Sequence, residues 1–234
     1  MHRLPKFMCR NTCTMKQLRT LLAENKFFFT FTLFVFVSAT FFLLLQTKEN
    51  SFLLCNPWHP VALDRFFTVF TNLGDGLFSL LIVLILMVRK KITTASLIFT
   101  AYLFSGLLAQ IAKNIYHAPR PATLFVSGSY RYFIQGITHV GYSSFPSGHT
   151  ASAFALATIF AILDPGKYRG IIYLLAACAI GYSRIYLGQH FPADVFGGAL
   201  LGFFSAVLVY LVFMRLKNRN IKPAYSRMHD WQID

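Results

Sequence analysis

Charged residues are scarce in this sequence. Only 13% of its 234 residues are Asp, Glu, Lys or Arg, whereas 56% are hydrophobic and 17% are aromatic. So few charges cannot coat the surface of a soluble globular protein of this length. The composition therefore excludes an ordinary soluble domain and indicates a membrane protein.

Cysteine is sparse too, and its spacing fits neither a disulfide framework nor a zinc site. Cys9 and Cys13 lie in a basic tail, Cys55 in a predicted loop and Cys178 in an apolar segment. A metal bound by Cys9 and Cys13 would have two ligands and no neighbouring His or Cys to complete the set. We therefore expect four free thiols. The sequence also lacks internal repeats and low-complexity segments, so one domain accounts for it.

Long apolar runs are abundant. Six of them are long enough, or nearly so, to cross about 30 Å of hydrocarbon. They cover residues 27–46, 66–88, 92–112, 149–163, 170–187 and 194–214. The fourth and fifth are short and contain small or polar residues such as Ser152 and Ser183, which predicts burial among neighbouring helices.

This pattern predicts an all-α polytopic membrane protein, a bundle of six transmembrane helices in residues 27–214. A basic tail at 1–26 precedes the bundle and a second basic tail at 215–234 follows it. The first apolar run is too long for a signal peptide, and no clean small-residue cleavage site follows it, so we expect a retained anchor.

The basic residues are distributed unevenly over the predicted loops. With the N-terminus in the cytoplasm, 16 of the 22 Lys and Arg residues fall on the cytoplasmic side. The positive-inside bias therefore predicts that both termini are cytoplasmic and that the loops at 47–65, 113–148 and 188–193 are extracytoplasmic. It also explains the net charge of +14 without a nucleic-acid partner.

Three polar clusters fall on that same predicted outer face, where ionisable groups need a partner or a function. The first runs from Lys113 to Arg120 and Pro121, where Pro119 and Pro121 stop the third helix from continuing. Taken alone, such a basic pair at a helix end is more often snorkelling to the membrane interface.

The second cluster is Pro146-Ser147-Gly148-His149, directly before the fourth apolar run. Ser147 is suited to cap a helix, and Gly148 lets its backbone N–H approach a ligand closely. Because helix N-termini attract anions, the cluster predicts a phosphate cradle.

The third cluster contains Ser183, Arg184, His190 and Asp194 at the turn between the fifth and sixth runs. Pro192 favours a helix start, which places His190 just ahead of the helix and Asp194 in its first turn. The spacing lets the carboxylate reach one imidazole nitrogen and leave the other free to attack.

Together these clusters resemble the tripartite signature of the type 2 phosphatidic acid phosphatase family. All eleven fixed positions of lysine-six-arginine-proline, proline-serine-glycine-histidine and serine-arginine-five-histidine-three-aspartate are present in order. The resemblance covers roughly residues 70–214.

The resemblance implies that His190 attacks phosphorus to form a phosphohistidine, that Asp194 orients His190, and that His149 protonates the leaving oxygen and later helps to activate water. It implies a metal-independent enzyme without a cofactor, with its active site at the outer mouth of a six-helix bundle. The groups that would bind the phosphoryl oxygens are Lys113, Arg120, Ser147, the Gly148 amide and Arg184.

The expected function is therefore hydrolysis of a lipid phosphate at the outer leaflet of a bacterial inner membrane. The motifs read the phosphate and not the tail, so isoprenyl diphosphate, phosphatidylglycerol phosphate, phosphatidate and lipid A all remain candidate substrates. The alternatives are a phosphotransferase that passes the phosphate to another lipid and a non-catalytic transporter or channel. Vanadate-dependent haloperoxidases share the signature but are larger, soluble proteins.

Some residues outside the signature also permit two interpretations. Asp75 lies in the second apolar run, where a surface position is as good an explanation as a function. His117 and His139 fall in the long outer loop, which favours simple solvation. Gly198 and Gly202, four residues apart, favour close helix packing.

Overall fold

The structure, a computed structural model, describes residues 18–125 and 130–229, with residues 218–229 described by their backbone alone. Within these ranges every regular element is helical, which confirms the predicted all-α class. Residues 1–17 and 230–234, which hold most of one predicted tail and the end of the other, lie outside the described part.

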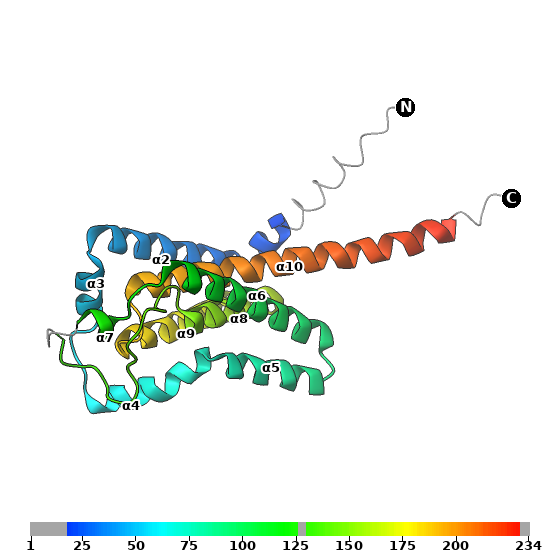
Figure 1. Cartoon of the computed structure of the whole chain (residues 1–234). Helices are drawn as coiled ribbons and strands as arrows, with labels where there is room; N and C mark the ends of the chain where they lie inside the picture. Colours follow the sequence, from blue (N-terminus) through cyan, green and yellow to red (C-terminus); the bar gives the residue numbers. More distant parts are fainter. Residues whose placement is uncertain (1–17, 126–129, 230–234) are drawn as a thin grey trace.

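Each of the six predicted segments falls on helical structure (Figure 1). The elements in chain order are α2 (Lys26–Leu45), α3 (Lys48–Cys55), α4 (Val61–Phe70), the 3-10 turn η1 (Thr71–Gly74), α5 (Gly76–Val88), α6 (Ile92–Tyr116), α7 (Pro121–Leu124), α8 (Gly148–Leu163), α9 (Lys167–Tyr186) and α10 (Pro192–His229).

The second predicted segment is not one straight helix. It is bent by 54° between Val61–Gly74 and Gly76–Val88. At the bend Asp75 has an extended backbone, and its Oδ1 accepts a hydrogen bond of 2.8 Å from the N–H of Leu77. A side chain that caps the backbone N–H groups of α5 in this way gives the chain a new helix start where the hydropathy pattern predicts continuity.

Two other boundaries differ from the prediction. Helix α6 continues past residue 112 to Tyr116, so Lys113 lies in its last turn. The helical backbone of α10 continues to His229, although its long apolar window ends at Lys217. Hydropathy marks where an apolar run ends, and a helix can extend beyond that point into polar surroundings.

Helix α8 lies at the centre of the bundle and packs against α6, α9 and α10. Most of its residues are buried, which confirms the expectation for the fourth segment. Gly198 and Gly202 of α10 make this contact close, because a methyl group at either position would overlap a backbone carbonyl oxygen of Ser147 or Ala151. Small residues at such a contact let two helix backbones approach closely.

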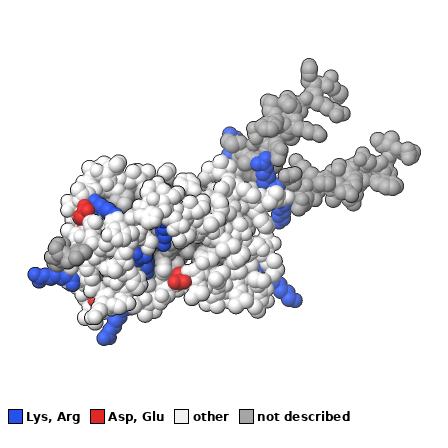
Figure 2. Space-filling view, viewed as in Figure 1, with Lys and Arg blue, Asp and Glu red and all other residues white. Residues whose placement is uncertain are grey.

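Three described helices are long and apolar enough to cross a membrane: Lys26–Leu45, Ile92–Leu124 and Pro192–Lys217. The bent pair α4–α5 would make a fourth span, and α8 is apolar but shorter. Large apolar side chains are widely exposed on the outside of the bundle, and Figure 2 shows a face with few charges. The chain is therefore a membrane protein, and the count of six spans stays a prediction.

The loops sort to two ends of the bundle. Figure 1 shows α3 and α7 at one end, and the α5–α6 connection with the later half of α10 at the other. The segments predicted to be extracytoplasmic thus share an end, which is the arrangement that the count of basic residues requires. Which side of the membrane that end faces stays a prediction.

Candidate active site

The three signature clusters meet at one end of the bundle. Ser147, the residue that caps α8, donates its backbone N–H to the carbonyl oxygen of Asp194 at 2.9 Å, joining the second cluster to the third. A methyl group placed on Gly148 would lie 3.8 Å from the Nζ of Lys113, so the first cluster borders the same point. All eight residues predicted for the site therefore belong to a single region of the fold.

Three cations from three separate elements converge there. Lys113 comes from the last turn of α6, Arg120 from the segment before α7, and Arg184 from the end of α9. They lie close enough to repel one another electrostatically. Because like charges gather only where an anion compensates them, the cluster has the character of an anion-binding site.

The hydrogen bonds of these cations leave donors free. Arg184 donates from Nη1 to the Thr71 hydroxyl at 2.8 Å, yet its buried Nε has no partner in the described part of the protein. Arg120 donates from Nη1 to Oε1 of Gln189 at 2.6 Å. An unpartnered, buried guanidinium nitrogen is costly unless a ligand supplies the acceptor.

His190 and Asp194 are the most enclosed ionisable groups of the site, with side chains only 3% and 2% exposed. Burial, together with Arg184, Arg120 and Lys113, holds the pKa of His190 well below its usual range. The imidazole is therefore neutral at physiological pH, as a nitrogen nucleophile must be.

Asp194 sits where the sequence predicts, in the first turn of α10, but a hydroxyl stands between it and His190. Its Oδ2 lies 3.9 Å from Nδ1 of His190, within ion-pair range and too far for a hydrogen bond. The Ser144 hydroxyl donates to the same Oδ2 at 2.5 Å and lies 3.4 Å from Nδ1 of His190. Ser144 is fully buried, and no signature position pointed to it.

Asp75 belongs to the site as well. Its Oδ2 lies 3.7 Å from Nε2 of His149, and the bend before α5 brings it there. Gly74 allows this approach, because a methyl group at that position would meet Ile180 at 2.5 Å and His149 at 3.2 Å. Since Thr71 of the same bend holds Arg184, the second helical segment positions two signature residues.

The N-terminus of α8 is built as the sequence predicts. The Ser147 side chain accepts two hydrogen bonds from Thr150, one from its backbone N–H and one from the Thr150 hydroxyl. Gly148 and His149 occupy the first turn, where backbone N–H groups have no acceptor within the helix. These groups are available to a phosphoryl oxygen.

Aromatic residues from α3 and from the segments around residues 130 and 191 cover one side of this region. Tyr130, Phe52 and Phe191 form a buried cluster in which Phe52 lies 5.0 Å from Tyr130 and 5.6 Å from Phe191, measured between ring centroids. Burial raises the pKa of the Tyr130 hydroxyl, which lies 2.9 Å from Nε2 of His59. The loop around Tyr130 therefore packs into the protein.

The other aromatic and histidine residues of these segments differ in exposure. His59 is buried between Tyr132 and Tyr186, with ring centroids 4.9 and 4.1 Å away, whereas Trp58 is exposed. His117 and His139 are both exposed, in keeping with solvated loop residues.

Possible metal ligands do not gather in the described residues, where no group of three or more His, Cys, Asp or Glu side chains could hold an ion. Cys55 and Cys178 are free thiols, and Cys9 and Cys13 lie outside the described part.

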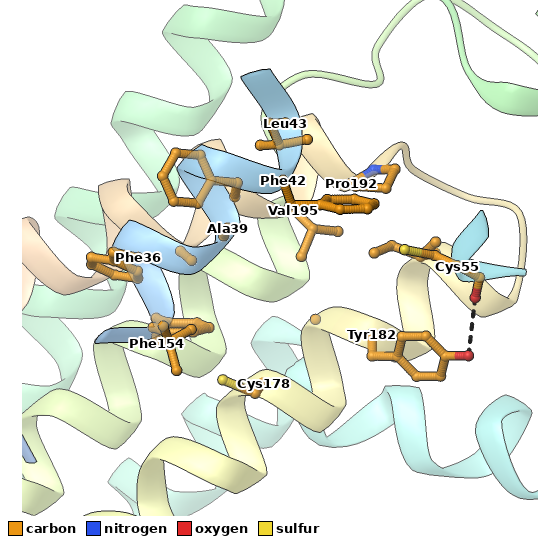
Figure 3. A pocket seen from close by; sticks show the side chains of 15 residues that line it. Phe36, Ala39, Phe42, Leu43, Cys55, Phe154, Cys178, Tyr182, Pro192 and Val195 are labelled. Atoms are coloured by element: carbon orange, nitrogen blue, oxygen red, sulfur yellow. Dashed lines mark hydrogen bonds between the residues drawn. The ribbon is translucent and has the colours of Figure 1, made fainter. Parts of the chain in front are cut away.

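A separate apolar pocket lies between α2, α8, α9 and α10 (Figure 3). Its volume is about 220 Å³, and none of the eight predicted site residues lines it. Tyr182 and Cys55 both line the pocket, and the Tyr182 hydroxyl donates a hydrogen bond of 3.1 Å to the carbonyl oxygen of Cys55. The lining is too apolar to bind a phosphate.

Comparison with known proteins finds relatives of this chain. The family model described as "PAP2 superfamily" matches residues 94–218. A lipid A 1-phosphatase of Rhizobium etli is 34% identical over 118 residues, which is 50% of this chain and 50% of that protein. The chain thus spans about half the length of the curated relatives that it matches.

Two solved structures share the fold. The crystal structure of Aquifex aeolicus LpxE aligns with a TM-score of 0.61 at 33% identity, covering 68% of this chain and 92% of that one. The first transmembrane PAP2 type phosphatidylglycerolphosphate phosphatase from Bacillus subtilis aligns with a TM-score of 0.58 at 24% identity, covering 80% and 94%.

Proposed function

This chain belongs to the PAP2 superfamily, and from that premise we propose that it is a membrane lipid phosphatase. It would hydrolyse a phosphomonoester or diphosphate of a membrane lipid in two steps, through a phosphohistidine on His190. No single substrate follows from the site, and the relatives named above differ in the lipid that their names contain.

One observation carries this proposal. A buried, neutral imidazole stands among three cations, one of which has an unpartnered guanidinium nitrogen. Such an arrangement gives a phosphoryl group both a nucleophile and compensation for its charge. Arg184 lies far from Lys113 and Arg120 in the sequence, so its convergence with them is a property of the fold.

The first step forms a bond between Nε2 of His190 and phosphorus and breaks the bond from phosphorus to the leaving oxygen. Lys113, Arg120 and Arg184 bind the equatorial oxygens, together with the free N–H groups at the start of α8. His149 donates a proton to the leaving oxygen, which departs as a lipid alcohol or a lipid monophosphate.

The second step releases the phosphate. His149, now neutral, takes a proton from a water molecule, and the resulting hydroxide attacks phosphorus. The bond from phosphorus to Nε2 of His190 breaks, and the imidazole returns to its neutral state. Because the three cations stabilise the transferring group, these steps invoke no metal ion.

The positive-inside bias supports an extracytoplasmic site with both termini in the cytoplasm. The bacterial relatives support a place in the inner membrane. A site at the extracytoplasmic end of the helices would meet the phosphate of a lipid in the outer leaflet.

The test is a panel of lipid phosphates offered to purified wild type and His190→Ala in detergent. We expect phosphate release from at least one lipid by the wild type and a loss of at least about 10³-fold in the variant. Vanadate should inhibit as a phosphate mimic, whereas a chelator should leave the rate unchanged. Equal rates for the two proteins would exclude the phosphohistidine.

A phosphotransferase would use the same phosphoenzyme. Labelled donor lipid incubated in membranes with candidate acceptor lipids separates the two reactions. Label that leaves only as free phosphate supports hydrolysis, and label that appears on a second lipid supports transfer.

A further inference from the structure

We propose that Ser144 is a positioning residue for the nucleophile, linking Asp194 to His190 through its hydroxyl. This inference rests on the proposed function, because it concerns how His190 is prepared for attack. It is drawn from the hydrogen bonds around one buried side chain.

The direction of these hydrogen bonds follows from proton counting. A serine hydroxyl has one proton, and that of Ser144 is donated to Oδ2 of Asp194 at 2.5 Å. Its contact of 3.4 Å with Nδ1 of His190 therefore requires the imidazole to donate and the hydroxyl oxygen to accept. The proton of a neutral His190 must then be on Nδ1.

This assignment decides which nitrogen attacks. With the proton on Nδ1, the lone pair is on Nε2. A backbone hydrogen bond with Ser144 also favours protonation of the ring. Asp194 cannot fix the tautomer by a direct hydrogen bond at 3.9 Å.

The position of Ser144 is itself fixed by its neighbours. Its backbone N–H donates to the carbonyl oxygen of Ala118 at 3.0 Å, which anchors it to the segment that leads into Arg120. On the other side, Oδ2 of Asp194 also accepts the N–H of Phe191 at 2.9 Å. The hydroxyl thus lies between two anchored groups and has little freedom to rotate away.

A purely structural role has to be distinguished, because Asp194 also caps α10. Its bond to the N–H of Phe191 is the N3-to-N-cap half of a capping box, and Ser144 could simply complete that cap. A cap contributes to the stability of the fold, whereas a hydroxyl that fixes the tautomer of His190 contributes to kcat. The experiment must therefore read both quantities.

The experiment compares wild type, Ser144→Ala, Ser144→Thr and Asp194→Ala, with Ser144→Ala also made in the Asp194→Ala background. The exposed neighbour Ser143 provides the matched control, as Ser143→Ala. For each variant the measurements are kcat and KM on the lipid that the wild type hydrolyses best, the amount of phosphoenzyme after rapid quenching, and the melting temperature in detergent.

If Ser144 positions His190, Ser144→Ala lowers kcat by about 10- to 100-fold, the size of effect seen when a group that orients a metal-bound histidine is removed. KM should change by less than about threefold. Phosphoenzyme formation slows by the same factor, and Ser144→Thr, which keeps the hydroxyl, recovers part of it. In the Asp194→Ala background the second substitution adds less than about threefold, because the two side chains act as one unit.

The inference is overturned if Ser144→Ala keeps the wild-type kcat, if it changes only KM or the melting temperature, or if its effect multiplies in full with that of Asp194→Ala. Should Ser144→Ala fail to fold, Ser144→Gly, which also removes the hydroxyl, replaces it, and a glycine variant with wild-type kcat overturns the inference equally. Failure of the wild type to release phosphate from any lipid would instead contradict the proposed function.

Discussion

At the scale of single residues, the site contains more cationic side chains than carboxylates. Lys113, Arg120 and Arg184 face the two carboxylates of Asp75 and Asp194, and each carboxylate also caps a helix. Burial lowers the pKa of His190, and the net positive charge that remains lowers it further, so the imidazole is neutral. The cations that would bind phosphate therefore also help to keep the nucleophile neutral.

The pH dependence of catalysis should follow from the protonation state of His190. Attack needs neutral His190, whose lowered pKa places the acid limb of kcat/KM well below pH 6.5. Arg120→Gln removes one of the charges that lower this pKa, so the pKa should rise and the acid limb should move to higher pH. Profiles of both proteins on one substrate measure the shift, since the titration of the substrate is then shared.

The control for that experiment is Arg131→Gln, which removes an exposed cation from the long loop between α7 and α8. Its acid limb should coincide with that of the wild type. An unchanged acid limb in Arg120→Gln would show that the cations do not set the protonation of His190.

Asp75 is expected to support His149 as the proton donor. Asp75→Asn keeps an oxygen to cap α5 but removes the charge that faces Nε2 of His149 at 3.7 Å. We expect about a tenfold loss of kcat on lipid phosphates, whose leaving oxygen needs a proton. A nitrophenyl phosphate has a leaving group that needs none, so the burst of nitrophenol that reports the first step should be almost unaffected.

Asp164→Asn is the matched control, because Asp164 pairs with Arg169 at 2.7 Å in the connection between α8 and α9. It should leave both substrates unaffected. Equal losses on the two substrates in Asp75→Asn would assign Asp75 to the fold instead of to proton transfer.

At the scale of elements, the central contact between α8 and α10 sets the position of the site. Gly198 lies against the backbone of Ser147, and Gly202 lies one turn further along, against Ala151. Helix α10 carries Asp194 and α8 begins at the phosphate cradle. A displacement of one helix therefore moves Asp194, and His190 just before it, away from the start of α8.

Gly202→Ala should destabilise the protein by about 1–3 kcal/mol, because its methyl group overlaps a backbone atom that cannot rotate away. Gly198→Ala should do the same and also lower kcat, since it pushes on Ser147. The melting temperature in detergent measures the first effect. Gly106→Ala is the control: nothing lies within 4 Å of the added methyl group, so it should be neutral or stabilising by about 0.5–1 kcal/mol.

Much of this could be predicted from the sequence. Hydropathy located all six helical segments, and fixed spacing selected the eight residues predicted for the site, which the fold brings to one region, because both patterns depend on local sequence. The bend at Asp75 and the intervening hydroxyl of Ser144 could not be predicted in this way. Each depends on contacts between residues far apart in the chain: Asp75 with His149, and Ser144 with Asp194.

At the scale of the whole molecule, the two ends of the bundle should lie on opposite sides of the membrane. In a variant that lacks Cys9, Cys13, Cys55 and Cys178, a single Ser143→Cys should react with an impermeant maleimide in intact cells. A single Lys91→Cys, in the connection between α5 and α6, should react only after the membrane is opened. The reverse pattern would place the site in the cytoplasm.

The unpartnered Nε of Arg184 has a consequence for the enzyme between turnovers. A pocket that compensates its charge by holding phosphate will also hold the phosphate that it has just released. Inorganic phosphate should therefore compete with the lipid and raise the melting temperature of the resting protein. Product inhibition of this kind would tie the rate of lipid turnover to the phosphate concentration outside the cell.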